Sequence, residues 1–326
     1  MREVQNPEYP LTLFYAFKQA ETDEDDDDSS TGLVSTGWET MLEGLIRAGF
    51  QITGTWPMRS ELSNRMIASG TNALASSIVL ACRARIDDAT IATRREFIAA
   101  LRRELPAALR TLEHGSIAPV DLAQAAIGPG IAVFSQYSKV VETSGETMRV
   151  RTALGLINQA LDEVLAEQDS EYDSATRWAL AWFEQFGVNE GPFGTAETLS
   201  KAKDVGVNGL QEAGIVRSKA GKVRIEPREA LDGAWEPATA PRLTIWEVTQ
   251  RLIRALETGG ESPAAEILRK VGALGETAKD LAYRLYTICE RKRWAQEALA
   301  YNMLVKSWPE LARAASGPSG ETARLL

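Results

Sequence analysis

The first 85 residues combine short apolar runs with one amphipathic segment. Apolar residues recur at steps of three and four between Trp38 and Ile46, and Gly49 follows, which predicts a helix over 37–47. Short apolar or alternating runs predict strands at 11–17, 51–57 and 73–82. A strand, a crossover helix and a second strand make a parallel pair, and the third run then favours an antiparallel hairpin at one sheet edge. We therefore expect residues 1–85 to form part of an α/β domain.

Helical periodicity dominates the chain after Arg83. An amphipathic helix is predicted over 94–112, and its arginines either follow a phosphate backbone or form a solvated face with Glu96 and Glu104 as counter-charges. Further apolar stripes predict helices at 150–164, 246–256 and 281–288. We expect a helical region over 86–168, a helical bundle with a docking surface over 241–315, and a disordered tail over 316–326.

Residues 169–240 mix helices with a basic hairpin. An apolar helix around Trp178 ends at a glycine-rich break, two short helices follow, and the basic turn Arg217–Gly221 leads into a strand at Lys222–Ile225. Helices followed by a basic hairpin are typical of a winged-helix-like module. Such a module would place five cations near DNA, namely Lys201, Lys203, Lys219, Lys222 and Arg224. The same pattern occurs in winged-helix folds that contact only protein, so both alternatives stay open.

The formal net charge of −9 is concentrated in one segment. The run Glu21–Asp28 holds seven acidic side chains, so the rest of the chain is close to neutral and DNA binding is not excluded. This run predicts a solvated loop or, alternatively, a regulatory mimic of a phosphate backbone. No apolar run approaches the roughly 18 residues of a membrane span, and no signal-peptide pattern is present, which predicts a cytoplasmic protein. Cys82, Cys289 and His114 have neither the number nor the spacing for a disulfide framework or a zinc site.

Several segments carry a resemblance to a known family. They are Tyr9–Thr12, Tyr15–Gln19, Ser35–Thr40, Ala48–Phe50, Thr55–Met58, Ser60–Met66, Asn72–Arg83, Ile117–Gly130, Ala298–Asn302 and Ser307–Glu310. Together they resemble the large adenine-specific DNA methylases that carry a zinc ribbon and an N-terminal domain of unknown function and occur in anti-phage gene clusters. The resemblance implies the last three strands of a class I methyltransferase sheet. The strand at 74–82 should then lie antiparallel between the other two.

The departures from this family limit what the chain can do alone. Members bind S-adenosylmethionine with a glycine-rich turn and hold the target adenine amine with an Asp-Pro-Pro-Tyr tetrapeptide, and neither motif occurs here, nor does the zinc ribbon. The segment Asn6–Tyr9 is better explained as the lead into the first strand. Gly128–Gly130 predicts a turn between helices, because Pro129 has no amide to donate to a phosphate. We therefore expect no catalytic, cofactor-binding or metal-binding residue in this chain.

Two functions follow from these observations. The first is the carboxy-terminal portion of an S-adenosylmethionine-dependent DNA adenine methyltransferase from an anti-phage or restriction-modification-like system, inactive without an N-terminal methylase segment that binds the cofactor. The second is a non-catalytic DNA-binding or assembly subunit of a defence complex, with DNA and other defence subunits as partners. In the family, the loop before the last strand lies near the substrate. Here that loop is 58–72, where Arg59, Asn64 and Arg65 meet phosphate or base edges unless it is an ordinary hairpin loop.

Overall fold

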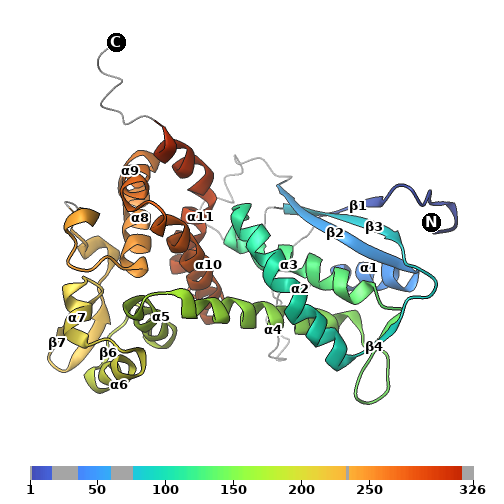
Figure 1. Cartoon of the computed structure of the whole chain (residues 1–326), viewed down its shortest axis with the longest axis horizontal. Helices are drawn as coiled ribbons and strands as arrows, with labels where there is room; N and C mark the ends of the chain where they lie inside the picture. The colour runs from blue at the N-terminus through green and yellow to red at the C-terminus, as the bar shows by residue number, and fades with distance from the viewer. Residues whose placement is uncertain (1, 17–35, 60–75, 233–234, 318–326) are drawn as a thin grey trace, which may run out of the picture. The chain divides into compact units, whose positions relative to one another are not determined.

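The computed structural model describes residues 2–16, 36–59, 76–232 and 235–317, and most of these residues are helical, with small sheets (Figure 1). The chain divides into two compact units, residues 1–166 and 167–326. The acidic run and the residues after 317 lie outside the described ranges. Within those ranges no helix is both long enough and apolar enough to cross a bilayer.

Unit 1 contains a three-stranded sheet, a two-stranded parallel pair and the longer helices that pack on them. Its elements are β1 (Leu11–Ala16), α1 (Thr36–Arg47), β2 (Phe50–Arg59), β3 (Ser76–Ala84), β4 (Ile91–Thr93), α2 (Arg94–His114), α3 (Pro119–Ser135), β5 (Lys139–Val141) and α4 (Val150–Gln168), which crosses the boundary between the units. A 3-10 turn at Arg2–Val4 precedes them. The predicted helices over 37–47, 94–112 and 150–164 are confirmed. The parallel pairing of β4 with β5 was not anticipated.

The strand order in the larger sheet is β1-β3-β2, and β3 runs antiparallel to both neighbours. Val79 of β3 lies opposite Phe14 of β1 on one side and Trp56 of β2 on the other. The expectation that the third strand lies between the first two is therefore confirmed. Gly49, with φ of +80°, ends α1 and turns the chain into β2, a backbone conformation that glycine adopts without strain.

The two faces of this sheet differ. Side chains alternate between faces along a strand, and Ile52, Leu80 and Cys82 on one face are fully buried. This face is covered by α1 and α3: the Trp38 ring lies 5.0 Å from the Tyr15 ring, and α3 packs along β2. On the opposite face three large apolar side chains remain exposed, namely Phe14 (72%), Trp56 (55%) and Met58 (50%).

The turn predicted at Gly128–Gly130 is wrong, because all three residues lie inside α3. A Cβ added at Gly128 would overlap the side chain of Thr55 on β2, and one added at Gly130 would lie 2.5 Å from Ile157 of α4. The two glycines therefore let the α3 backbone approach its neighbours closely. Their role is set by tertiary packing, which the local pattern does not reveal.

Unit 2 begins with a small mixed module and continues into four helices. The module contains α5 (Ser174–Phe186), β6 (Gly191–Pro192), α6 (Phe193–Lys203), α7 (Val207–Glu212), β7 (Val216–Lys219) and β8 (Lys222–Ile225). The four helices are α8 (Ile245–Gly259), α9 (Glu261–Val271), α10 (Leu274–Lys292) and α11 (Ala295–Ser316). Short 3-10 turns lie at Asp169–Glu171, Arg228–Ala230 and Pro237–Thr239. The predicted helices of the bundle and the strand at 222–225 are confirmed.

A single carboxylate joins the module to the helices that follow it. Asp173 is the N-cap of α5 and accepts from the backbone N–H of Thr176 at 2.9 Å and from its hydroxyl at 2.6 Å. The same carboxylate accepts from the backbone N–H of Ile245, and Thr176 Oγ1 accepts from that of Trp246. Two helix N-termini therefore share one pair of polar side chains, which satisfies amide groups that helices leave without internal partners.

Candidate nucleic-acid interface

The hairpin of β7 and β8 is closed by a two-residue turn. Ala220 and Gly221 both have positive φ, 51° and 75°, the backbone of a type I′ turn that matches the twist of paired strands. β8 also pairs with β6, so the sheet order is β6-β8-β7. The backbone N–H of Phe193, the first residue of α6, donates to the Gly221 carbonyl at 2.9 Å. The tip of the hairpin is thereby held against the start of α6.

Cationic side chains share one face of this hairpin. Lys219 lies directly opposite Lys222, and Arg217 directly opposite Arg224, so strand alternation places all four side chains on one face. The other face is apolar and packs inward, with Val216, Val223 and Ile225 buried. Like charges placed opposite each other destabilise a strand pair. This face therefore carries four positive charges close together.

Only part of this charge is neutralised within the protein. Lys222 pairs with Glu190 at 3.1 Å, and Arg217 pairs with Glu226. Among the described residues, Lys219 and Arg224 have no ion pair. Lys219 is exposed and Arg224 is half-buried, so the unneutralised charge is accessible from solvent. The structure therefore brings together Lys219, Lys222 and Arg224 of the predicted set and adds Arg217, which the alternating sequence pattern of the hairpin could have revealed.

The other predicted cations lie elsewhere. Lys201 and Lys203 lie in the last turn of α6, whereas the hairpin tip contacts its first residue, so the two groups are separated by roughly 12 Å of helix at 1.5 Å per residue. The groove beside α7 has mixed charge, since Lys201 is accompanied there by Glu197 and Asp204. The hairpin face, rather than this groove, is the stronger candidate for contact with a polyanion.

The predicted loop before β3 is not tested by the structure. Arg59 is the last residue of β2, and Asn64 and Arg65 lie outside the described residues. Their contact with phosphate or base edges stays a prediction.

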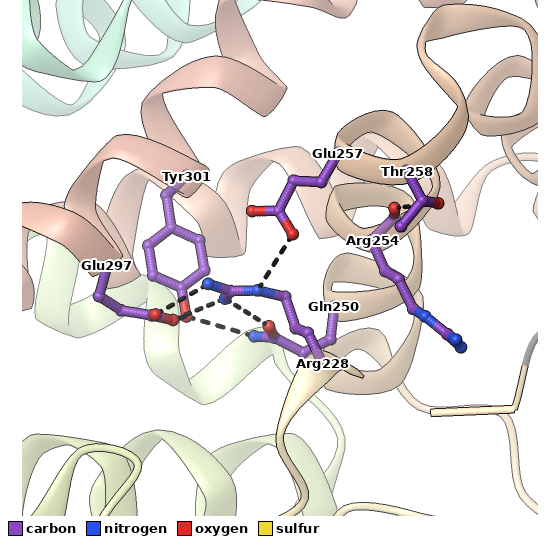
Figure 2. Close-up of polar contacts among 7 residues, drawn as sticks. All are labelled: Arg228, Gln250, Arg254, Glu257, Thr258, Glu297 and Tyr301. Carbon is purple, nitrogen blue, oxygen red and sulfur yellow. Dashed lines mark hydrogen bonds and ion pairs between the residues drawn. The ribbon is translucent and has the colours of Figure 1, made fainter. Parts of the chain in front are cut away.

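A buried polar cluster, which the sequence pattern did not indicate, joins Arg228 to side chains of α8 and α11 (Figure 2). Arg228 donates from Nη1 to Glu297 Oε1 at 2.6 Å and from Nη2 to Glu297 Oε2 at 2.8 Å. Nη1 also donates to Gln250 Oε1 at 3.1 Å, and Nε lies 3.8 Å from Glu257 Oε2. The Tyr301 hydroxyl donates to Glu297 Oε1 at 2.8 Å and accepts from Gln250 Nε2 at 3.3 Å.

Two groups of this cluster, Arg228 and Tyr301, have raised pKa values. Burial alone would lower the pKa of the Arg228 guanidinium, but the Tyr301 oxygen and the carboxylates of Glu297 and Glu257 outweigh burial and raise it above its usual value. Burial, reinforced by the negative charge of Glu297, raises the pKa of the Tyr301 hydroxyl well above its usual range. Neither group is therefore suited to act as an acid or base near neutral pH. Burial also raises the pKa of the Glu257 carboxyl, while the charge of Arg228 acts in the opposite direction.

The position of the cluster explains how the hairpin is held. Arg228 follows β8 closely in the chain, Gln250 and Glu257 belong to α8, and Glu297 and Tyr301 belong to α11. The bidentate pair of Arg228 with Glu297 thus fastens the segment after the hairpin to two helices of the bundle.

Part of the chain matches a family model. Residues 173–324 match the family model described as a domain of unknown function (DUF8807). The matched region begins at Asp173, the N-cap of α5, and lies within unit 2, so it contains both the hairpin and the Arg228 cluster. No curated protein matches the chain, and no solved structure matches it.

Proposed function

We propose that this chain is the carboxy-terminal portion of an S-adenosylmethionine-dependent DNA adenine methyltransferase from an anti-phage or restriction-modification-like system, inactive by itself. The observation that supports this proposal most directly is the strand order β1-β3-β2 with an antiparallel central strand. A class I methyltransferase sheet of the resembled family ends in this order. The coverage of one sheet face by the crossover helix α1 agrees with the same topology.

The edge of β1 supplies a second argument. Among the described residues β1 pairs only with β3, and in this proposal a strand of the N-terminal methylase segment pairs with its other edge. Phe14 of β1 and Trp56 of β2 are exposed on the uncovered face of the same sheet. An N-terminal methylase segment would continue the sheet from β1 and bury this apolar face. Both features are costly in an isolated domain, because unpaired strand edges and exposed apolar patches favour association.

The reaction would transfer a methyl group from S-adenosylmethionine to the exocyclic amine of a flipped-out adenine, with release of a proton from the amine. The chain itself has no glycine-rich turn and no Asp-Pro-Pro-Tyr tetrapeptide, so its residues do not form a site for the cofactor. In this proposal the chain contributes the end of the sheet at which β1 and β2 finish and β3 begins. There Ala16 and Met58 both lie opposite Ser77. Arg59, the last residue of β2, lies at this end of the sheet.

In this proposal the module of unit 2 is winged-helix-like and binds the DNA backbone. The order helix, strand, two helices and hairpin, with a β6-β8-β7 sheet, supports that assignment. The cations on the hairpin face would contact phosphates, which contributes affinity without sequence recognition. The six-residue helix α7 has no cation, so base recognition would come from another part of the enzyme.

The alternative is a non-catalytic DNA-binding or assembly subunit of a defence complex. The family match favours this alternative in one respect. The matched region covers the module and the four helices of unit 2 and none of the three-stranded sheet. In that case unit 2 would carry the function, and the sheet would be a remnant.

A reconstitution experiment separates the two functions. The chain is co-purified with an N-terminal methylase segment that carries the glycine-rich turn and the Asp-Pro-Pro-Tyr motif, and transfer of labelled methyl groups to DNA is measured. We expect transfer by the complex and none by either part alone. Methylation by the 326-residue chain alone would refute the proposal. DNA binding without methylation in the complex would support the alternative.

A further inference from the structure

We propose that unit 1 contains a phosphate-binding site in a cavity of about 320 Å³ between α1, the end of α3, β5 and the start of α4. Its lining includes the cations Arg47, Arg85, Lys139 and Arg149, with Phe134 and Tyr137. We call this cavity the basic pocket. It lies at the end of the sheet where Phe50 pairs with Ala84, whereas the proposed methyl transfer takes place at the opposite end, near Ser77. The inference therefore does not depend on the proposed function.

The lining of the basic pocket has more positive than negative side chains. Glu43 is the only carboxylate among its lining residues and is paired with Arg47 at 2.6 Å. Lys139 and Arg149 are exposed, and among the described residues they have no ion pair. Two accessible cations thus line a cavity whose one carboxylate is already paired with another cation. A concave cluster of unpaired cations raises the local concentration of anions.

Arg85 adds a third cation without a counter-ion. Its guanidinium donates to the carbonyls of Ile46 at 3.4 Å, Ser135 at 3.4 Å and Tyr137 at 3.0 Å, and not to a carboxylate. These hydrogen bonds place the guanidinium beside the cavity. Its positive charge also compensates the partial negative charge at the C-terminal ends of α1 and α3. Burial, together with the nearby charge of Arg2, lowers the pKa of Arg85, a cost that a bound anion would relieve.

The backbone brings the two accessible cations together. The N–H of Met148 donates to the Val140 carbonyl at 2.8 Å, which places Arg149 beside the strand that starts at Lys139. Arg149 immediately precedes α4, and the first turn of α4 has no acidic residue. The positive end of the helix dipole therefore adds to the charges of the side chains instead of being neutralised.

The ligand chemistry that fits is a phosphate group on a nucleotide. Arginine and lysine side chains bind phosphate oxygens through charge-assisted hydrogen bonds. The cavity is larger than one phosphate needs, and the rings of Phe134 and Tyr137 belong to its lining, which suits a nucleoside attached to the phosphate. The phosphate could belong to a free mononucleotide or to a DNA strand, and the two sources can be distinguished experimentally.

The test uses the full chain and three probes: inorganic phosphate, adenosine monophosphate and a short single-stranded oligonucleotide. Binding is measured by titration calorimetry, and the rise in Tm is measured with each probe against chloride at equal ionic strength. The test variant is the double substitution Lys139→Gln and Arg149→Gln, and the control is Arg95→Gln, another exposed arginine of unit 1. The oligonucleotide is measured with Lys219→Gln and Arg224→Gln in the background, so that the hairpin does not contribute.

We expect phosphate and at least one nucleotide probe to bind, and the double variant to bind roughly tenfold or more weakly because two charge-assisted hydrogen bonds are removed. The Arg95 control should bind like the wild type. Binding of the mononucleotide alone identifies a free nucleotide as the ligand, and binding of the oligonucleotide alone identifies a DNA strand. The absence of any phosphate-specific rise in Tm, or equal binding by all three proteins, would overturn the inference. A failure of methylation in the reconstituted complex would not bear on it.

Discussion

Arg228 and Glu297 form a two-bond ion pair across 69 residues of the chain, with N–O distances of 2.6 and 2.8 Å. Both side chains are largely buried, with exposed fractions of 14% and 21%. The pair fastens the segment after the basic hairpin to α11. Because a buried charge without its partner is strongly destabilising, this contact should be among the most sensitive in unit 2.

Substitution of Arg228 by Ala should therefore lower the free energy of unfolding by about 3 kcal/mol, since it leaves the Glu297 carboxylate buried without its cation. Denaturant unfolding of the purified variant measures this change. The matched control is Arg254→Ala in α8, whose guanidinium points away from the cluster in Figure 2. It should change stability by less than about 0.5 kcal/mol. Equal effects of the two substitutions would contradict the role given to the pair.

Gly128→Ala should destabilise the protein by about 1–3 kcal/mol, because the added methyl group would overlap Thr55 and force α3 away from β2. Gly155→Ala is the control, since this glycine lies in α4 with no atom near the added Cβ. That substitution should stabilise the helix by about 0.5–1 kcal/mol through its higher helix propensity. Thermal unfolding of the two variants gives the comparison, and a stabilised Gly128→Ala protein would show that the close approach is absent.

Cys82 should react slowly with alkylating reagents in the native protein. Burial raises the pKa of its thiol to about 11, and the side chain is fully buried within the sheet. Because the folded pKa lies above the unfolded value of about 9, the thiol contributes stability that is fully present below pH 9 and is lost as pH rises to about 11. Stability measured between these pH values should fall less in Cys82→Ala than in the wild type. An identical fall would argue against this assignment.

Removing the accessible charge of the hairpin should weaken DNA binding without regard to sequence. Lys219→Gln with Arg224→Gln should reduce the slope of log K against log salt by about 0.9 for each phosphate of duplex DNA that is no longer neutralised. Lys306→Gln, an exposed lysine of α11, serves as the control and should leave the slope unchanged. Fluorescence anisotropy over a salt series gives both slopes. Unchanged binding by the double variant would exclude the hairpin as the interface.

The open edge of β1 should cause self-association. We expect the isolated chain to form oligomers or aggregates and to become monodisperse with an N-terminal methylase segment, as judged by light scattering at equal concentration. Phe14→Lys should reduce self-association without a decrease in stability, because Phe14 is 72% exposed. Tyr9→Lys changes a residue of similar exposure outside the strand and should have little effect. A monomer in the absence of the segment would mean that the edge is covered from within the chain.

Much of the local structure could be predicted from the sequence because its causes are local. The steps of three and four in 94–112 and in 150–164 match α2 and α4, since an amphipathic helix needs only one apolar stripe. The strand expected at Lys222–Ile225 matches β8, but the turn expected at Arg217–Gly221 is wrong for Arg217–Lys219, which belong to β7, so that only Ala220 and Gly221 form the turn. The central place of β3 was expected only through the resemblance to methylases, because strand order depends on contacts that no single segment encodes.

By itself, then, the sequence determined where several of the longer helices form and which of their faces are apolar, because side-chain periodicity acts over a few residues. Only the tertiary structure decided that Gly128 lies within a helix, that Arg228 meets Glu297, and that Arg85 lies in a pocket with two accessible cations. These features depend on residues that are distant in the chain and meet only when the elements pack. Contacts between distant residues produce no periodic pattern in the sequence. Each partner therefore cannot be told from an ordinary glycine or surface charge until its neighbour is known.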